Sequence, residues 1–290
     1  MKPAPFGYEA PETLDDAVRA LSGDDAKLLA GGQSLIPILS LRLGRFSRLI
    51  DLRRIEELRS IASVNGGVRI GAMVTQSVAA AHPVVRAGVP LLPKATRHIG
   101  HFQIRNCGTI GGSIAHADPA AELPAVALAL DATMELVGPG SRRLVPASDF
   151  FRSSYTTACD DDEILAAVTF PSWPTGAGFA IEEVVRRSGD FALVGAVCGV
   201  HVIDARIAWI AIGLFGVGSA PVRASGAEAL FVGRPVAELG EPSLTEGGYI
   251  AMSNTEPPDD VHASAAYRRS VGAHVVARVV AAALKDATDA

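Results

Sequence analysis

Two glycine-containing segments are the places in this sequence where residue type and spacing best suggest chemistry: Leu29–Leu35 and Thr109–Pro119. Each places a Gly-Gly pair after a strand-like run and before a possible helix start. Glycine lets the backbone approach another group closely, and successive N–H groups in such a turn can bind phosphate oxygens. Four side chains in these segments can add hydrogen bonds: Gln33, Ser34, Thr109 and Ser113. Facing each other, the segments could hold a pyrophosphate; two ordinary glycine turns are the alternative interpretation.

The histidines and their neighbours give weaker indications of chemistry. His116 and Asp118 resemble an acid–base pair, but residues two apart share a face only in a strand, so a structural or cofactor-contacting role is favoured. His98 and His101 could share a helix face, yet no third ligand is evident, so we predict no metal site. No catalytic side chain is predicted either.

Composition and missing motifs exclude several classes of protein. The chain has 290 residues, of which 49% are hydrophobic and 20% charged, with a formal net charge of -5. This predicts a globular protein of about two domains and disfavours disorder and nonspecific nucleic-acid binding. No G-x-G-x-x-G, P-loop, G-x-S-x-G or H-E-x-x-H motif occurs, so a Rossmann dinucleotide site is not supported. The three widely spaced cysteines disfavour a zinc or iron–sulfur site built from this chain alone.

The termini and the apolar runs indicate where the protein resides. No uncharged stretch is long and continuous enough to span a bilayer. The first residues lack the apolar region of a signal peptide. We therefore expect a cytoplasmic protein with no transmembrane segment.

The elements that must position the glycine segments follow from hydrophobic patterning. Leu14–Leu21 has helical spacing, with Thr13 as its N-cap and Gly23 closing it. Strand-like runs at 26–30 and 49–52 flank a helix-like segment at 33–43, which predicts a small βαβ-like unit. Three hairpins are predicted where strand-like runs flank turn residues: 61–72, 133–145 and 191–214.

The remaining segments carry less distinct patterns. Helices are predicted at 75–88, 89–99 and 119–130, and a strand at Gln103–Ile110. Residues 236–260 are rich in turn formers, and 261–284 predicts one long helix or two shorter ones. The run PSWPTGAG at 171–178 is typical of a domain boundary. We accordingly predict two domains, 1–175 and 176–290.

Four stretches resemble the flavoprotein subunit of molybdenum hydroxylases, in order and over nearly the whole chain. This family includes the medium subunit of aerobic carbon monoxide dehydrogenase and the FAD domain of xanthine dehydrogenase. The stretches are AGGQSLIPILSLRL (30–43), QIRNCGTIGGSIAHADPAAELPA (103–125), VVRRSGDFALVG (184–195) and DVHASAAYRRSVGAHVVARVVAAAL (260–284).

The resemblance implies an α+β fold and a cofactor site. The fold is the two-subdomain FAD-binding fold of the vanillyl-alcohol oxidase / p-cresol methylhydroxylase type, plus a smaller C-terminal α+β domain. Both glycine loops wrap the FAD pyrophosphate in the family. Carried over, the first loop is Leu29, Ala30, Gly31, Gly32, Gln33, Ser34 and Leu35, and the second is Thr109, Ile110, Gly111, Gly112 and Ser113.

Further residues match family positions near the cofactor. Asp118 and Glu122 correspond to the ribose and adenine side of FAD, although relatives often carry Asp in place of Glu122, and an exposed first-turn acid is the alternative. Ile164 or Leu165 fits an apolar contact with the isoalloxazine, with a core position as the alternative. Phe191 corresponds to an aromatic, often Tyr, that covers one face of the flavin; a core aromatic is the alternative.

Two groups of charged residues qualify the resemblance. Some relatives carry a Lys near the flavin just before the R-R-x-G-D motif, whereas this chain has Glu182-Glu183-Val184-Val185 there. Tuning of the flavin by a nearby cation is therefore in doubt. Arg186-Arg187 and Arg268-Arg269 are interpreted as surface or interface charges.

The resemblance implies an FAD-binding electron-transfer subunit of a heterotrimeric molybdenum hydroxylase. A molybdenum cofactor is expected on a large partner subunit and two [2Fe-2S] clusters on a small one, with electrons passing through FAD to an external acceptor. A dimer of heterotrimers is the family expectation. There are two alternatives. One is a stand-alone FAD-dependent oxidase or reductase on the same fold, and the other is a noncatalytic scaffold with degenerate glycine loops. The sequence names neither the substrate nor the acceptor, nor the molybdenum ligand variant.

Overall fold

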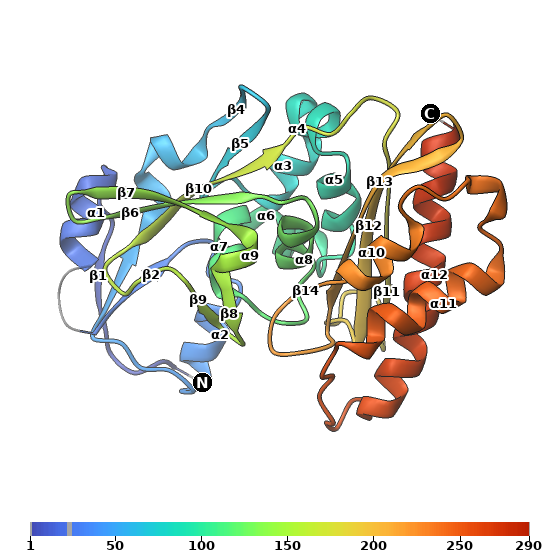
Figure 1. Cartoon of the computed structure of the whole chain (residues 1–290). Helices are drawn as coiled ribbons and strands as arrows, with labels where there is room; N and C mark the ends of the chain where they lie inside the picture. The colour runs from blue at the N-terminus through green and yellow to red at the C-terminus, as the bar shows by residue number, and fades with distance from the viewer. Residues whose placement is uncertain (1, 22–24, 290) are drawn as a thin grey trace.

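The computed structural model describes residues 2–21 and 25–289 and has three sheets at its centre (Figure 1). The first is a three-stranded parallel sheet of order β1-β3-β2, formed by β1 Gly7–Glu9, β2 Ala26–Leu29 and β3 Arg48–Asp51. Helix α1 Leu14–Leu21 packs its buried stripe beside it, and α2 Leu35–Ser40 lies in the connection from β2 to β3. The expected βαβ-like unit is thus confirmed, as is Thr13 at the start of α1, whose hydroxyl accepts the N–H of Asp16 at 3.1 Å. The predicted end at Gly23 lies outside the described residues.

A five-stranded antiparallel sheet follows, in the order β4-β5-β10-β6-β7. Its strands are β4 Ile61–Val64, β5 Gly67–Gly71, β10 Ile164–Pro171, β6 Thr133–Gly138 and β7 Ser141–Pro146. The two predicted hairpins at 61–72 and 133–145 are its two edges, and Gly66 and Gly140 take the positive φ values of 80° and 66° that their turns require. Two short 3-10 helices, Leu52–Arg54 and Glu56–Arg59, connect the first sheet to this one.

A group of short helices covers one face of the second sheet. They are α3 Gln76–Ala81, α4 Pro83–Gly88, α5 Leu91–Thr96, α6 Phe102–Cys107, α7 Ile110–His116 and α8 Glu122–Ala129. A further helix α9 Ala147–Phe150 and the small ribbon of β8 Phe151–Ser153 and β9 Thr156–Thr157 follow β7. The strand predicted at Gln103–Ile110 is wrong, because residues 103–107 belong to α6, which packs on α3, and Ile110 begins α7. Arg105 donates to the carbonyls of Ile99 and Gly100 at 2.8 and 2.9 Å and so fixes the helix over the preceding turn.

The C-terminal part has a four-stranded antiparallel sheet, β11-β12-β13-β14. Its strands are β11 Gly178–Val184, β12 Val194–Ile203, β13 Arg206–Phe215 and β14 Val222–Arg223. Its helices are α10 Ser225–Phe231, the 3-10 turn Val236–Glu238, α11 Glu241–Ser253 and α12 Ala265–Asp289. The predicted β12–β13 hairpin is confirmed, and Asp204 and Ala205 at its tip both have positive φ, 49° and 59°, as a type I′ turn requires.

Helix α11 occupies part of the segment 236–260 that the sequence predicted to be turn-rich. Its Gly247-Gly248 pair has a packing role, since a Cβ on Gly248 would collide with the carbonyl oxygen of Ala273 in α12. The glycines therefore permit a close crossing of α11 and α12 on the outer face of the sheet. The last segment forms one helix, α12, rather than two.

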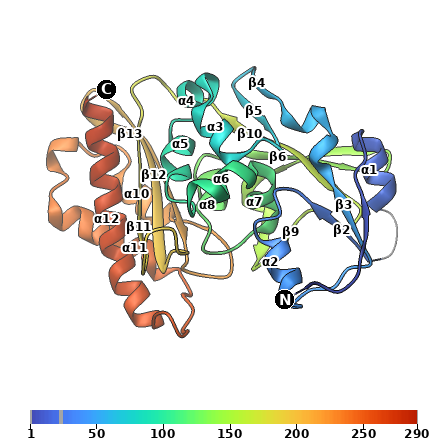
Figure 2. The same cartoon turned by 180° about the vertical axis from the view of Figure 1, so that it is seen from behind.

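Helix α8 joins the two larger sheets. Seven of its eight residues are buried, and it lies between the helices of the second sheet and the inner face of the third (Figure 2). A Cβ on Gly213 of β13 would lie 2.7 Å from the carbonyl oxygen of Ala125, so strand and helix are in direct contact. One hydrophobic core consequently runs from the second sheet through α8 to Val197 and Phe215 of the third. The predicted architecture, two α+β subdomains followed by a smaller α+β unit, is confirmed. Among the described residues, no helix combines the length and apolar character needed to cross a membrane.

Candidate functional site

The two glycine loops lie against each other, although 76 residues separate Gly31 from Cys107. A Cβ on Gly31 would collide with the carbonyl oxygen of Cys107 and lie 2.8 Å from the Cα of Gly108, just before the second loop. A Cβ on Gly112 would lie 3.3 Å from the Cβ of Ala30. Helix α2, which follows the first loop, and helix α7, whose first turn holds the second loop, are neighbours in both views (Figures 1 and 2). The structure therefore brings together the two segments that the sequence singled out.

The first loop presents backbone donors that the protein leaves unused. Gly32 has φ of 71°, and Gln33 Nε2 donates to the carbonyl oxygen of Gly31 at 3.0 Å. Within residues 2–21 and 25–289, the main-chain N–H groups of Gly32, Gln33 and Ser34 have no protein acceptor. Ser34 precedes α2 without a side-chain capping bond. A row of free N–H groups beside a glycine is the arrangement that binds phosphate oxygens.

The second loop has its backbone donors occupied by the protein. Ile110 N–H donates to Val74 O at 2.9 Å and Gly111 N–H to Ala72 O at 3.0 Å. Thr109 Oγ1 accepts the N–H of Gly112 at 2.9 Å, as an N-cap. A Cβ on Gly111 would collide with the Cβ of Ala72. The expectation that both loops offer free N–H groups therefore holds only for the first; the second contributes a closely approachable backbone and the half-buried hydroxyl of Ser113.

His116 and Asp118 end the second segment. Asp118 is buried, and its carboxylate accepts the N–H of Ala120 at 2.9 Å and the hydroxyl of Tyr155 at 3.3 Å. His116 Nε2 is 3.9 Å from Asp118 Oδ2, and its ring packs at a tilt of 42° against that of Tyr155, with 5.1 Å between the ring centroids. Burial lowers the pKa of His116 below its usual value, so the imidazole is neutral near pH 7. The cluster fixes the turn after α7, in keeping with the structural role that the sequence favoured.

Glu122 is buried, contrary to the alternative of an exposed first-turn acid. It is the first residue of α8 and only 8% exposed. Burial, and then the nearby Glu183 carboxylate, raise the pKa of Glu122 to about 8. The carboxyl group is therefore mainly protonated at neutral pH.

Glu183 and His98 complete a buried cluster with Glu122 that sequence reasoning missed. Glu183 Oε1, on β11, lies 3.1 Å from His98 Nδ1, and this hydrogen bond raises the pKa of His98. Glu183 Oε2 is buried and, in the described part of the chain, has no hydrogen-bond partner. His101 does not pair with His98; its ring packs on Gly189 instead. The available signal was the acidic pair Glu182-Glu183 just before the R-R-x-G-D motif.

The apolar candidates separate into buried and exposed residues. Ile164 and Leu165, at the start of β10, are 0% and 4% exposed and belong to two hydrophobic cores. Their contact with a flavin stays a prediction. Phe191 is 66% exposed, so its ring is free to cover a planar ligand, and the core alternative for it is wrong.

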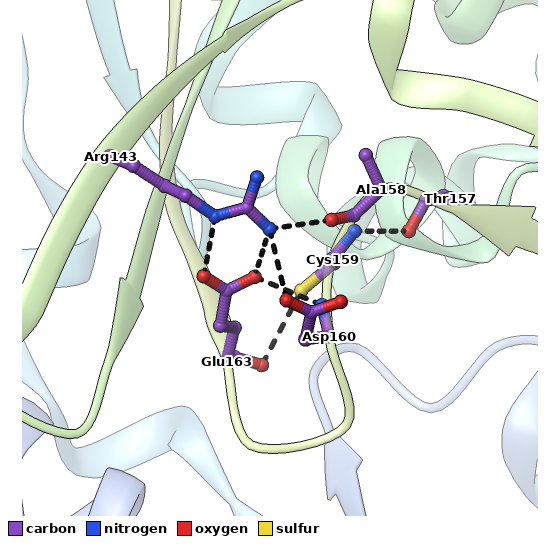
Figure 3. Close-up of polar contacts among 6 residues, drawn as sticks. All are labelled: Arg143, Thr157, Ala158, Cys159, Asp160 and Glu163. Atoms are coloured by element: carbon purple, nitrogen blue, oxygen red, sulfur yellow. Dashed lines mark hydrogen bonds and ion pairs between the residues drawn. The ribbon is translucent and has the colours of Figure 1, made fainter.

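A polar turn sets the position of β10 (Figure 3). Glu163, immediately before Ile164, accepts Arg143 Nε at 2.7 Å and the N–H of Asp160 at 2.9 Å. Arg143 lowers the pKa of Glu163, so this carboxylate is charged. Burial raises the pKa of Cys159 to about 12, and the thiol is therefore neutral and unreactive as a nucleophile. This turn is structural.

Arg268 corrects another expectation. It was interpreted as a surface or interface charge, but it is 4% exposed. Its Nη1 donates to the carbonyl oxygen of Leu193 and its Nη2 to Asp260 at 2.7 Å. Because Leu193 follows Phe191 by two residues, Arg268 anchors one end of the loop that presents Phe191. Elsewhere, no group of three His, Cys, Asp or Glu side chains among the described residues is placed to hold a metal ion.

Comparison with known proteins agrees with this geometry. Residues 4–173 match the family model described as the FAD binding domain in molybdopterin dehydrogenase, and residues 179–283 match the CO dehydrogenase flavoprotein C-terminal domain. The chain is 35% identical over 285 residues to the carbon monoxide dehydrogenase medium chain of Hydrogenophaga pseudoflava, covering 98% of both chains. It is 36% identical over 281 residues to the nicotine 6-hydroxylase medium subunit of Paenarthrobacter nicotinovorans, covering 97% of this chain and 98% of that one.

A solved structure is similar over the whole length. It is the structure of carbon monoxide dehydrogenase from Hydrogenophaga pseudoflava in the form that lacks the Mo-pyranopterin moiety of the molybdenum cofactor. One chain of that structure superposes on this protein with a TM-score of 0.95 at 36% identity, and the match covers 99% of each chain. Fold and sites thus define a flavoprotein component of an oxidoreductase. The chain belongs to the family of FAD-binding medium subunits of molybdenum hydroxylases.

The residues present fit FAD. The absence of side chains at Gly31 and Gly112 lets the backbones of the two loops approach each other closely, and the N–H groups of residues 32–34 are free to donate to a pyrophosphate. Glu183 has a buried carboxylate oxygen without a partner among the described residues, which a hydroxyl donor of a ligand would satisfy. Phe191 offers an exposed ring.

Proposed function

We propose that this chain is the electron-transfer subunit of a heterotrimeric molybdenum hydroxylase. Electrons would come from two [2Fe-2S] clusters on a small partner subunit and leave through FAD to an external acceptor. Substrate oxidation would take place at a molybdenum cofactor on a large partner subunit, so the substrate is selected there. The similarity to chains named as medium subunits supports this division, and a dimer of heterotrimers is the assembly we expect.

The observation that carries the proposal is the contact between the two glycine loops, with free N–H groups on the first. We assign pyrophosphate binding to the 29–35 loop, with 109–113 closing it from the other side. Asp118 and Glu122 would face the ribose and adenine side, and Phe191 would cover the flavin. We place the division between the FAD-binding and C-terminal domains at residues 175 and 176.

The residues of this chain bind and orient rather than react. FAD, when bound, supplies the redox chemistry. The first loop neutralises phosphate charge with backbone dipoles, without any Lys or Arg. The protonated Glu122 keeps net charge near the cofactor low, and the loop anchored by Arg268 holds Phe191 over the site.

The test is the visible spectrum of the chain purified with the proteins encoded beside it, followed by identification of the released chromophore. Stoichiometric FAD with iron–sulfur absorbance and two partner bands is the expected result. FAD without partners would favour a stand-alone flavoenzyme. A colourless protein that cannot be reconstituted with FAD would contradict the proposal and leave a scaffold.

A further inference from the structure

A cavity of about 500 Å³ lies on the surface of helices α3 to α6, and every ionisable residue that lines it is a cation. Its ionisable lining residues are Arg86, Lys94, Arg97 and Arg105, and no acid lines it, in a chain whose net charge is -5. The floor is small and apolar, formed by Ala80, Ala81, Pro90 and Pro93.

Three of these four cations keep an uncompensated charge. Lys94 is neutralised by Asp286 at 2.6 Å. Arg86 and Arg105, in contrast, donate to main-chain carbonyls: Arg86 Nε to Ala80 O at 3.2 Å, and Arg105 to the two carbonyls described above. These bonds hold the guanidinium groups in place without cancelling their charge. Arg97 is exposed, and its side chain has no polar partner in the described ranges of the chain.

The neutral polar groups of the cavity are already engaged. Thr96 Oγ1 donates to Leu92 O at 2.8 Å, and Ser77 Oγ lies 3.4 Å from Thr75 Oγ1. Sites for small ligands usually bury a few specific polar groups that fix the ligand's orientation. Here the available donors are long arginine side chains spread over three helices at an open surface. This arrangement fits an extended partner that makes several charge pairs better than a single small anion.

We propose that this basic groove docks an acidic segment of a partner subunit. Asp or Glu side chains would pair with Arg86, Arg97 and Arg105, and small apolar side chains of the segment would cover the Ala and Pro floor. The inference rests on the proposed function, because it requires that the chain has a partner. It concerns a surface that is distinct from the glycine loops and the Glu122 cluster.

The test uses the complex purified by a tag on this chain after co-expression with its partners. The variant is Arg86→Glu with Arg97→Glu. Its matched control is Arg206→Glu with Arg45→Glu. Arg206 likewise donates to a carbonyl, that of Gly233, and Arg45 is likewise exposed without an ion pair in the described residues. Both variants change the charge by the same amount.

The groove variant should bind its partners roughly tenfold more weakly than the control at 50 mM salt, and the difference should shrink at 500 mM salt. FAD content should equal that of the control, because the substituted residues lie outside the cofactor loops. Equal partner recovery for both variants at low salt would overturn the inference. A thermal-shift titration with inorganic pyrophosphate gives a second way to overturn it. If pyrophosphate stabilises the wild type and the control but not the groove variant, while the groove variant still binds its partners, the ligand of the groove is a small anion. A wild-type chain that carries FAD but no partner would overturn the inference together with the partner part of the proposed function.

Discussion

The glycine loops and the Glu122–Glu183–His98 cluster are built by opposite means. The loops are neutral, and backbone atoms make their contacts: Gly31 on Cys107, Gly111 on Ala72 and Gly112 on Ala30. The cluster is made of ionisable side chains from α8, β11 and the turn after α5, brought together where the two larger sheets meet. Steric contacts do not respond to pH, whereas buried carboxyl groups do. The geometry of the loops is therefore set by shape and that of the cluster by protonation.

The largest expected effect comes from Glu122. Its folded pKa of about 8 is above the usual value of about 4.5, so the folded state holds a proton that the unfolded state loses between pH 4.5 and 8. Stability therefore falls as pH rises through that window, by about 4 kcal/mol at about 1.4 kcal/mol per pKa unit. Glu122→Gln should remove most of this fall, measured by urea unfolding at pH 5 and pH 8. Glu238→Gln, at an exposed residue, is the control and should keep the pH dependence of the wild-type unfolding free energy. If the unfolding free energies of Glu122→Gln and wild type change with pH in parallel, the burial of the Glu122 carboxyl group is contradicted.

Gly111→Ala should be the most damaging loop substitution. The new methyl group would collide with the Cβ of Ala72 and lie 2.6 Å from its Cα, and backbone must move to admit it. Overpacking of this kind costs about 1–3 kcal/mol, at any pH. Gly226→Ala is the control, because a Cβ there meets only a side-chain methyl at 3.3 Å. Equal unfolding midpoints for the two variants would show that the second loop is not clamped on residue 72.

Thr109→Val should have a smaller effect. It removes the hydroxyl that accepts the N–H of Gly112 and keeps the side-chain shape. Loss of an N-cap costs about 1 kcal/mol, so the unfolding free energy should fall by that amount. An unchanged unfolding free energy would mean that the N–H of Gly112 makes no hydrogen bond to Thr109, and that it is free like the N–H groups of the first loop.

Ser34→Ala should have the smallest effect on the free protein, below about 0.5 kcal/mol, because Ser34 makes no capping bond. The same substitution should weaken FAD binding, measured by flavin fluorescence titration of the apo-protein. The pair Thr109→Val and Ser34→Ala thus separates structural from cofactor-binding roles at two similar motifs. A stability loss for Ser34→Ala as large as that for Thr109→Val would remove the distinction.

Sequence reasoning predicted the loops well because their signals are local. A Gly-Gly pair after a strand is visible within ten residues, and so are the hairpin turns at Gly66 and Gly140. The contact of Gly31 with Cys107 was not predictable, since it depends on how α6 packs, and α6 itself was predicted as a strand. Short helices of six residues leave little periodicity to detect.

The cluster shows a different limit. Glu122 was identified only as a cofactor contact, and nothing in its neighbourhood along the chain predicts burial beside Glu183, 61 residues later. The contact is set by tertiary packing of β11 on α5 and of α8 on β12 and β13. Similarly, residues 236–260 were predicted to be turn-rich, because the sequence pattern does not reveal that the Gly247-Gly248 pair lies where α12 crosses α11.

Helix α8 has a consequence for how such subunits diversify. Helix α8 is buried on both sides, against its own subdomain and against β12 and β13. The surface that the C-terminal unit presents to α8 is therefore hydrophobic and not suited to contact with water. A chimera that joins the first part of this chain to the C-terminal unit of a relative must carry over the facing surfaces of α8 and β13 together, down to the Gly213–Ala125 contact. The two units therefore fit each other as a matched pair and cannot be freely exchanged at the peptide link between them.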